Sequence, residues 1–304
     1  MDLRQLRALV AVGEHRSFSA AARALHTVQS NVSTHVSRLE REMGVSLVDR
    51  STMELTEEGA VVAARARRIE AEFSALESDV ASMRDEIRGR VRIGVIGTTA
   101  RWLVPPLLEA LNARHPAISV VVLDATTSSL VPQLVAGQID LAVVNLPVSD
   151  PDVSIEPLFD EDRLLVAPPG HPLHSRRSVT LADLAEYPLL LEAEGTAFRD
   201  EVDAEAAALG IRLQAQAEFD GMRLLASLAF AGFGAAILPA SAAPHSVDGA
   251  WRRVPITDVS SRSVGLARRK RGLPSAAERA VADVITSVVA TDAPKQDGLH
   301  PVPG

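Results

Sequence analysis

The sequence predicts an α/β protein with an all-α helix-turn-helix domain at the N-terminus, a long linker helix and a two-lobed α/β domain. Three observations lead to this fold class. Apolar residues recur at helical spacing near the N-terminus, a heptad repeat follows, and strand and helix patterns then alternate. The predicted boundaries are 1–58 for the helix-turn-helix domain, 59–89 for the linker, 90–290 for the two-lobed domain (lobe one 90–162 plus 267–290, lobe two 163–266) and 291–304 for a disordered tail.

The composition is that of an ordinary globular protein, with 47% hydrophobic and 23% charged residues in a chain of 304. The net charge of -8 argues against a protein that coats nucleic acid indiscriminately. The first fifty residues differ, because seven Arg against five acidic residues give them a net charge of +2. Only this segment is suited to a local contact with a polyanion.

Several functional classes are excluded or disfavoured by residue content. The chain has no cysteine, which excludes disulfides, thiolate catalysis and cysteine-ligated zinc. The eight His residues show no ligand spacing and no nucleophile motif is present, so we expect no metal, no cofactor and no enzyme activity. No segment resembles a signal peptide or a membrane span of about 20 apolar residues. We therefore expect a cytoplasmic protein with no membrane partner.

The N-terminal segment predicts three short helices. Leu3, Leu6, Leu9 and Val10 mark the first helix, which Gly13 interrupts. The second runs from about Ser19 to Leu25, with Ser17 or Ser19 as its cap, and a turn at 26–28 leads into a third helix over 29–43.

The third helix has two contrasting faces. Val32, Val36, Leu39 and Met43 form a narrow apolar stripe, whereas the opposite face carries small polar and basic side chains. Those on the polar face are Ser30, Thr34, Ser37 and Arg41, flanked by Asn31 and Arg38. Short hydroxyls and amides reach base edges while Arg contacts phosphate, which favours a helix for the major groove. Taken alone, this helix fits an ordinary solvated surface better, and it is the pair of helices joined by a tight turn that shifts the balance toward DNA.

The segment SFSAAARALHTVQSNVSTHVSRLEREMGVSLVDR, followed by LTEEG, resembles the DNA-binding domain of LysR-type transcriptional regulators. The matching positions are Phe18, Ala21, Ala22, Leu25, Gln29, Ser33, Leu39, Glu40, Gly44, Leu47, Arg50, Leu55, Thr56 and Gly59. The chain departs from the family pattern at Val28, where a capping Ser or Thr is usual, at Thr34, where a basic residue is common, and at Val48, where Phe is common. Thr27 is expected to take over the cap with a shift of one residue.

The resemblance implies a winged helix-turn-helix whose third helix binds double-stranded DNA. The residues expected to face DNA are Gln29, Ser30, Asn31, Ser33, Thr34, Ser37 and Arg38. Residues 45–56 would form the wing, with Arg50 near the DNA backbone or the minor groove. A salt bridge from Arg50 to Glu40 or Glu42 inside the domain is an equally good interpretation.

A heptad repeat covers the predicted linker helix, which runs from Glu57 to about Arg88. Apolar residues are spaced alternately four and three apart, the pattern of a helix that pairs along its length with another helix. The predicted dimer seam is Val62, Ile69, Phe73, Leu76, Val80 and Met83, with Ala66 and Ile87 in the same register. A long helix packed on its own domain is the alternative. The family resemblance also implies a homodimer, with a homotetramer formed by further contacts.

Lobe one is predicted as a β-α-β-α-β unit with strands at 91–97, 118–124 and 139–145 and helices at 105–114 and 130–136. Such an order gives a parallel sheet, and ligands bind at the carboxyl ends of its strands. Small hydrogen-bonding residues follow all three strands: Thr98, Thr99, Thr126, Thr127, Ser128 and Asn145. Singly, each is more often a helix cap, but three clusters at successive strand ends favour a ligand site.

The second lobe, and runs such as GQIDLAVV, resemble the effector domain of the same family, which is like the two-lobed type 2 periplasmic binding proteins. This implies a small-molecule effector between the lobes, with Thr196 and Phe198 facing lobe one, and chain crossings near 161–165 and 264–268. Arg199 and Arg101 are candidates for binding a carboxylate, although a surface salt bridge is the default for each. The basic run 268–271 is expected to be a solvated turn.

Together these features predict a transcriptional regulator, activating or repressing, that binds promoter DNA and responds to an unidentified effector. RNA polymerase is a further candidate partner. A periplasmic solute-binding protein is the competing hypothesis, because the back two-thirds of the chain fits one. The recognition helix and the missing signal segment argue against it, and an enzyme lacks any acid, base or nucleophile constellation.

Overall fold

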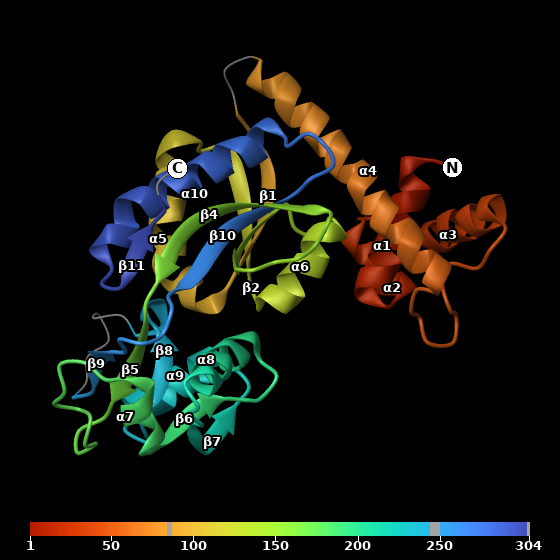
Figure 1. Ribbon diagram of the computed structural model, residues 1–304. Helices are drawn as coiled ribbons and strands as arrows, with labels where there is room; N and C mark the ends of the chain where they lie inside the picture. Colours follow the sequence, from red (N-terminus) through yellow and green to blue (C-terminus); the bar gives the residue numbers. More distant parts are fainter. Residues whose placement is uncertain (84–86, 244–249, 303–304) are drawn as a thin grey trace.

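The computed structural model describes residues 1–83, 87–243 and 250–302. It has three parts: a small helical domain, one long helix and a larger α/β domain of two lobes (Figure 1). The small domain packs on the first half of the long helix, and lobe one lies beside its second half (Figure 1). The predicted fold class is therefore confirmed.

The helical domain contains α1 (Leu3–His15), α2 (Phe18–Ala24) and α3 (Gln29–Met43). Asp2 and Gln5 form a capping box at the start of α1, and Ser17 caps α2 by accepting a hydrogen bond from the Ala20 amide at 3.3 Å. Apolar faces of the three helices meet in one core, which Leu47 and Val48 complete. A single antiparallel bridge between Val48 and Leu55 closes the predicted wing.

The long helix, α4 (Glu57–Ser82), is anchored at its start by close packing. Thr56 caps it by accepting a hydrogen bond from the Gly59 amide at 3.0 Å. A Cβ at Gly59 would lie 1.9 Å from the Leu47 carbonyl oxygen, so only glycine permits this approach. The helix was predicted to reach Arg88, but it ends at Ser82, and residues 84–86 lie outside the described residues.

Lobe one is a six-stranded sheet in the order β11-β4-β10-β3-β1-β2. Its strands are β1 (Gly89–Val95), β2 (Ile118–Asp124), β3 (Leu141–Asn145), β4 (Val153–Glu161), β10 (Arg262–Arg269) and β11 (Leu299–Pro301). Its helices are α5 (Gly97–Arg114), α6 (Thr127–Val135) and α10 (Ala276–Asp292). As predicted, β1 is parallel to both β2 and β3, whereas β10 is antiparallel to β3 and β4.

Both predicted helices of lobe one begin earlier than predicted: α6 starts at Thr127 instead of Leu130, and the difference is larger for α5. The sequence places its start at Pro105, but α5 begins at Gly97 and contains both Pro105 and Pro106. Leu103, Leu107 and Leu111 are buried, and their packing outweighs the hydrogen bonds that the two prolines cannot donate. Thr98 and Thr99 therefore lie in the first turn of α5 and not in a loop.

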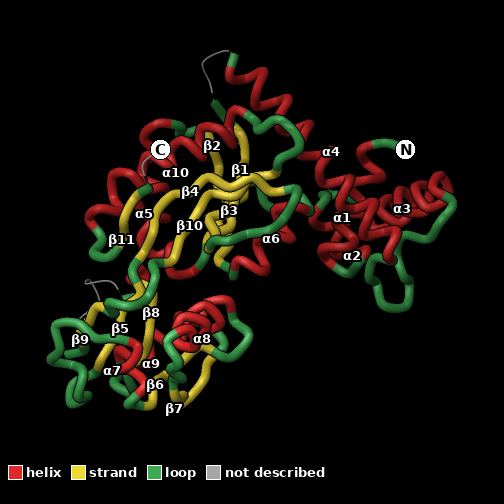
Figure 2. Tube along the Cα trace, viewed as in Figure 1, coloured by secondary structure: helices red, strands yellow, loops and turns green. Residues whose placement is uncertain are grey.

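Lobe two is a five-stranded sheet in the order β7-β6-β8-β5-β9. Its strands are β5 (Arg163–Ala167), β6 (Pro188–Glu192), β7 (Gln214–Phe219), β8 (Ala236–Pro239) and β9 (Arg252–Pro255). Its helices are α7 (Leu181–Ala185), α8 (Ala197–Ala208), α9 (Met222–Phe230) and the short η1 (Ala240–Ala242). Figure 2 shows the two sheets joined by only narrow connections.

The chain crosses between the lobes twice. The first crossing is at Asp162, between β4 and β5, where the sequence places it. The return crossing lies between β9 and β10, so residues 262–266 belong to lobe one and the predicted boundary at 267 is wrong. The reason is that β10 pairs with β4 along its whole length, starting with Arg262 opposite Glu161.

The predicted disorder after residue 290 is also wrong for the described residues. The helix α10 continues to Asp292, and a short η2 (Ala293–Lys295) and β11 follow. Ala293 and Leu299 are buried, and β11 adds an edge strand to lobe one beside β4. Two buried apolar side chains and a strand pairing hold a segment whose composition suggests a flexible tail.

Candidate DNA-binding face, linker and effector site

The predicted DNA-binding side chains lie on the outer face of α3. Val32, Val36 and Leu39 are buried in the domain core, as the apolar stripe predicts, whereas Met43 at the end of the stripe is exposed. The opposite side is exposed or half-buried at all seven predicted positions: Gln29, Ser30, Asn31, Ser33, Thr34, Ser37 and Arg38. Since α3 lies at the far end of the molecule from the lobes, a large partner can reach this face (Figure 1).

The first turn of α3 has no side-chain cap. Its N-cap is Val28, and the expected replacement by Thr27 does not occur. Thr27 Oγ1 instead accepts a hydrogen bond from Asn31 Nδ2 at 3.0 Å, because Val28 already has the extended backbone of an N-cap and fixes the helix start at Gln29. The amides of this turn are suited to an acceptor from outside the chain, such as a phosphate.

Arg50 makes contacts inside the domain. Its Nη2 donates to Glu40 Oε2 at 3.0 Å and to Ser37 Oγ at 3.4 Å, and its guanidinium lies 4.7 Å from the centre of the Phe18 ring. Glu40 also accepts a hydrogen bond from the Leu47 amide at 3.0 Å, which fixes the start of the wing. The salt-bridge interpretation of Arg50 is thus the observed arrangement, although the side chain stays partly exposed.

The heptad positions of α4 form an exposed apolar stripe. The buried face of α4 consists of small residues, including Ala63, Ala66 and Ala75, that pack on the chain's own domains. The exposed large apolar side chains include five of the predicted positions: Ile69, Phe73, Leu76, Val80 and Met83. Val62 differs, because it packs against the core of the helical domain. We call the five exposed residues the linker seam.

In lobe one, the predicted effector residues form two hydrogen-bonded groups at the carboxyl ends of the strands. Thr127 Oγ1 accepts a hydrogen bond from the backbone amide of Asn145 at 3.0 Å, which joins the start of α6 to the end of β3. Thr126 Oγ1 lies within hydrogen-bond distance of Ser128 Oγ at 3.0 Å and makes no cap bond to α6. Thr98 Oγ1 accepts a hydrogen bond from Arg262 at 3.2 Å. The alternative prediction, that the Thr126 hydroxyl serves as a helix cap, therefore does not hold.

Two polar atoms in this region are buried without a hydrogen bond to any described residue. They are Thr99 Oγ1, on a side chain with no exposed surface, and Asn145 Oδ1. Buried polar atoms in folded proteins are nearly always paired, so the lack of a hydrogen bond at these two atoms is unusual.

In lobe two, Phe198 lies at the junction with lobe one, whereas Arg199 does not act there. The Phe198 ring is nearly buried, with the guanidinium groups of Arg163 and Arg262 at 5.5 Å and 5.9 Å from its centre. Arg199 forms ion pairs with Asp203 and Glu218, as the default interpretation has it, but its side chain is buried and does not lie on the surface. Thr196 is the N-cap residue of α8, but its Oγ1 bonds the Ala193 carbonyl at 2.9 Å instead of capping the helix. Arg101 is exposed.

Arg262 links the two lobes, and the sequence does not single it out. Its Nε donates to Glu161 Oε1 at 2.8 Å in an ion pair that is almost completely buried. Glu161 Oε2 accepts a hydrogen bond from the Ser241 amide of lobe two at 3.1 Å. With Thr98 on one side and Phe198 on the other, Arg262 contacts predicted effector residues of both lobes. The Arg262–Glu161 pair lies within lobe one, whereas an ion pair between Arg223 of α9 and Asp124 at the end of β2 joins the two lobes directly.

Burial affects one carboxyl group of this junction. Glu192 ends β6, and burial raises its pKa, an effect that the charge of Arg262 opposes. No sequence pattern distinguishes Glu192 or Arg262 from other charged residues at strand ends. The two side chains come close to each other only once the strands of the two sheets are paired.

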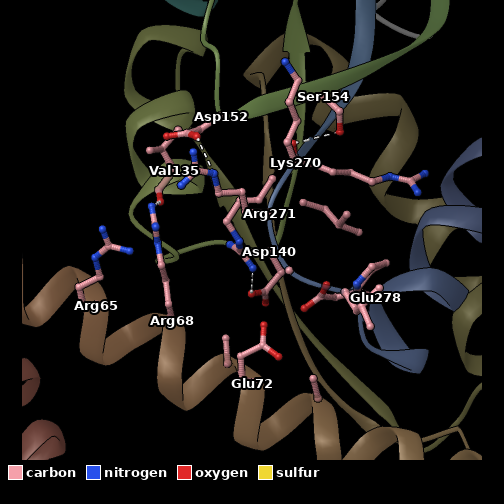
Figure 3. Close-up of a pocket in the computed structure, with 18 residues that line it drawn as sticks. Arg65, Arg68, Glu72, Val135, Asp140, Asp152, Ser154, Lys270, Arg271 and Glu278 are labelled. Carbon is pink, nitrogen blue, oxygen red and sulfur yellow. Dashed lines mark hydrogen bonds and ion pairs between the residues drawn. The ribbon is translucent and has the colours of Figure 1, made fainter.

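A polar cavity of about 500 Å³ separates α4 from lobe one (Figure 3). From the long helix it is lined by Arg65, Arg68 and Glu72, and from lobe one by Asp140, Glu278 and the basic run after β10. The carboxyl groups of Glu72, Asp140 and Glu278 point toward one another (Figure 3). Burial and the neighbouring Asp140 raise the pKa of Glu278 to about 7, and burial raises the pKa of Asp140.

The basic run beside this cavity is only partly the solvated turn that its composition suggests. Arg269 is mostly buried and donates to the Ile139 carbonyl at 2.8 Å, so it fixes the loop that leads into β3. Arg68 of α4 donates to the Val135 carbonyl at 2.8 Å, at the end of α6. The long helix is therefore docked on lobe one through polar contacts.

Within residues 1–83, 87–243 and 250–302, no group of three or more His, Cys, Asp or Glu side chains is placed to hold a metal ion. Among the same residues, no helix is both long enough and apolar enough to cross a membrane.

Two family models match the chain and together cover most of it. The model of the bacterial regulatory helix-turn-helix protein of the lysR family matches residues 3–60, and the LysR substrate binding domain matches residues 84–290. The chain belongs to the LysR family of transcription regulators. It is a DNA-binding regulator with an effector domain, as the motif around α3 predicts, and its family consists of regulators and not of enzymes.

Whole-length relatives support this assignment. A probable hydrogen peroxide-inducible genes activator of Mycobacterium leprae is 36% identical over 94% of each chain. Full-length OxyR of Pseudomonas aeruginosa, with a cysteine replaced by aspartate, has a TM-score of 0.76 at 26% identity and covers 95% of this chain and 94% of its own. CbnR in complex with its target DNA has a TM-score of 0.69 at 26% identity, over 96% of this LysR chain and all of its own.

Proposed function

We propose that this LysR regulator binds promoter DNA through the outer face of α3, acting as a homodimer whose linker helices pair along the linker seam. The exposed polar face of α3 and its uncapped first turn support the DNA contact. A similar regulator, CbnR, has been solved with its target DNA. Further pairing to a homotetramer, contact with RNA polymerase and action in the cytoplasm complete the proposal.

Ser33→Ala and Arg38→Ala should each weaken operator binding without unfolding the domain. Both side chains lie on the outer face of α3, so their removal costs little packing. If Arg38 contacts a phosphate, its loss should also reduce the dependence of log K on log salt by about one unit. The measurement is a titration of labelled operator at several salt concentrations. Arg65→Ala on α4 is the control, and wild-type affinity in both test variants would contradict the assignment of this face.

Phe73→Asp combined with Leu76→Asp should dissociate the linker dimer. These exposed side chains lie one heptad step apart in the linker seam, and burying two unpaired carboxylates between helices is strongly unfavourable. Sedimentation velocity measures the result, with Leu209→Asp, an equally exposed apolar position in lobe two, as the control. Both proteins are also compared without the effector domain, so that contacts between effector domains do not hide the result. If the truncated double variant still sediments as a dimer, like the truncated wild type, the dimer contact lies outside the linker seam.

For the effector, we propose non-covalent binding at the carboxyl ends of the lobe-one strands, with Thr98, Thr99, Thr126, Thr127, Ser128 and Asn145 facing Thr196 and Phe198. The unpaired Thr99 Oγ1 and Asn145 Oδ1 support this position. The relative in M. leprae is named for induction by hydrogen peroxide. This chain contains no cysteine, so thiol oxidation and disulfide formation cannot carry its signal. A reversibly bound small molecule that prefers one arrangement of the lobes can shift them without thiol chemistry.

Thr99→Val should abolish or weaken ligand-dependent stabilisation while leaving the free protein as stable as the wild type. The valine keeps the shape, and no hydrogen bond within the described residues is lost. Losing one hydrogen bond to a ligand costs about 0.5–1.5 kcal/mol, a shift that a thermal-shift titration detects. The probes are small carboxylates, aromatic acids and hydrogen peroxide. Thr291→Val, on the surface of α10, is the control. A ligand that stabilises Thr99→Val as well as the wild type would move the site away from this strand end.

A further inference from the structure

The residues after α10 return to the junction between the lobes. Following η2, the chain passes through Asp297 and Gly298 into β11, at the end of lobe one that carries the crossing strands (Figure 1). β11 pairs antiparallel with the last residues of β4, with Leu299 opposite Glu161 and His300 opposite Asp160. The Val302 amide donates to the Leu158 carbonyl at 3.0 Å and extends this pairing by one step. The segment is therefore fixed to lobe one.

The same segment is also fixed to lobe two. Arg253 of β9 donates from Nη2 to the Asp297 carbonyl at 2.6 Å. Gly298 lies against η1 so closely that a Cβ on it would be 2.8 Å from Ala240 Cβ. Its φ of +81° is a further reason why glycine stands here.

The residue at the first crossing is held between these contacts. The Asp162 amide donates to the Gly298 carbonyl at 2.8 Å, and the Asp162 carbonyl accepts a hydrogen bond from the Ala240 amide at 2.8 Å. His300 Nε2 lies 2.9 Å from Asp162 Oδ1. The backbone on both sides of the crossing is thus tied to the C-terminal segment or to η1.

We propose that residues 296–302 form a strap that sets the angle between the two lobes. Any rotation of lobe two about Asp162 moves Arg253 and Ala240 relative to β4. The strap is bonded to β4 of lobe one and to Arg253 of lobe two, so such a rotation must strain or break some of its contacts. In the function proposed above the effector shifts the lobes, and the strap then limits how far their arrangement changes. The inference does not depend on where the effector binds.

The test uses the full chain and its lack of cysteine, which permits site-specific thiol labels without background. Spin labels are placed at Glu109→Cys on α5 and Leu209→Cys after α8, both exposed, and the labelled protein is diluted into unlabelled protein to isolate distances within one chain. Pulsed electron paramagnetic resonance then gives the distribution of distances between the lobes. The variants are a truncation after Gln296 and Gly298→Ala, which inserts a Cβ against Ala240 but leaves the rest of the strap in place. A truncation after Val302 is the matched control.

The strap predicts that truncation after Gln296 and Gly298→Ala both broaden the distribution or shift it by several ångström, whereas the control leaves it unchanged. Circular dichroism establishes whether each variant is folded. If the truncated chain is unfolded, the proposal is judged on Gly298→Ala alone. A folded Gly298→Ala variant with the wild-type distribution overturns the proposal. The same result for truncation after Gln296 also overturns it.

Discussion

Arg262→Ala should lower the free energy of unfolding of the effector domain by about 3–5 kcal/mol, because it leaves a buried carboxylate without its cation. Glu161 has no exposed surface, and Arg262 is its ion-pair partner on the neighbouring strand. The loss also removes the hydrogen bond to Thr98 and the guanidinium near Phe198. The measurement is urea denaturation of the full-length protein at neutral pH, followed by a probe of the lobes.

The matched control for this variant lies on the same strand. Arg268 pairs with Glu156 near the other end of β10, where both side chains are considerably exposed. Arg268→Ala should therefore cost less than about 1 kcal/mol, as exposed ion pairs usually do. Arg262→Leu combined with Glu161→Met removes both buried charges and should recover much of the lost stability. Equal, small effects of Arg262→Ala and Arg268→Ala would show that the buried pair does not hold the two crossing strands together.

The DNA-binding domain could be predicted from the sequence because its determinants are local. The third helix spans 29–43 in both the prediction and the structure, since its apolar stripe and the turn before it lie within one short segment. The parallel core of lobe one was predictable for the same reason, as apolar runs alternate with helices. The heptad repeat of α4 is a periodic pattern as well. Its first predicted residue, Val62, is not part of the linker seam because the helical domain lies over that end of α4.

The parts that were missed depend on pairing between distant segments. β4 carries Pro157, which cannot donate a hydrogen bond, and its register with β10 shifts at this point, so the strand lacks a regular alternation. Arg262 and Glu161 are 101 residues apart, and only the pairing of β4 with β10 brings them together. The strap has a tail-like composition, and most of its bonds to Asp162 and Arg253 involve backbone atoms that leave no trace in the side-chain pattern.

The docking of the linker helix on lobe one should depend on pH through Glu278. Asp79 and Ser78 of α4 accept hydrogen bonds from the Ala276 and Ala277 amides of α10, at 2.8 Å and 3.2 Å. Glu278 therefore lies in the first turn of a helix whose first two amides are bonded to α4. The charged groups that face it are Asp140 before β3, Glu72 on α4 and Arg269 on β10, so two carboxylates oppose its ionisation and one cation favours it.

Glu278→Gln should make the protein more stable than the wild type at pH 8 and nearly remove this pH dependence. The pKa of Glu278 is raised from 4.5 to about 7 in the folded protein, so the folded state binds the proton more tightly than the unfolded state. The stabilisation is fully present below the unfolded pKa and is lost as pH rises through the folded pKa. The window is therefore pH 4.5 to about 7. A shift of this size corresponds to about 3 kcal/mol in total. Denaturation of both proteins between pH 5 and 8 measures the difference, with Glu109→Gln, an exposed carboxylate on α5, as the control. A difference between Glu278→Gln and the wild type that stays constant over this range would show that Glu278 is already ionised in the folded protein at pH 5, which contradicts the raised pKa.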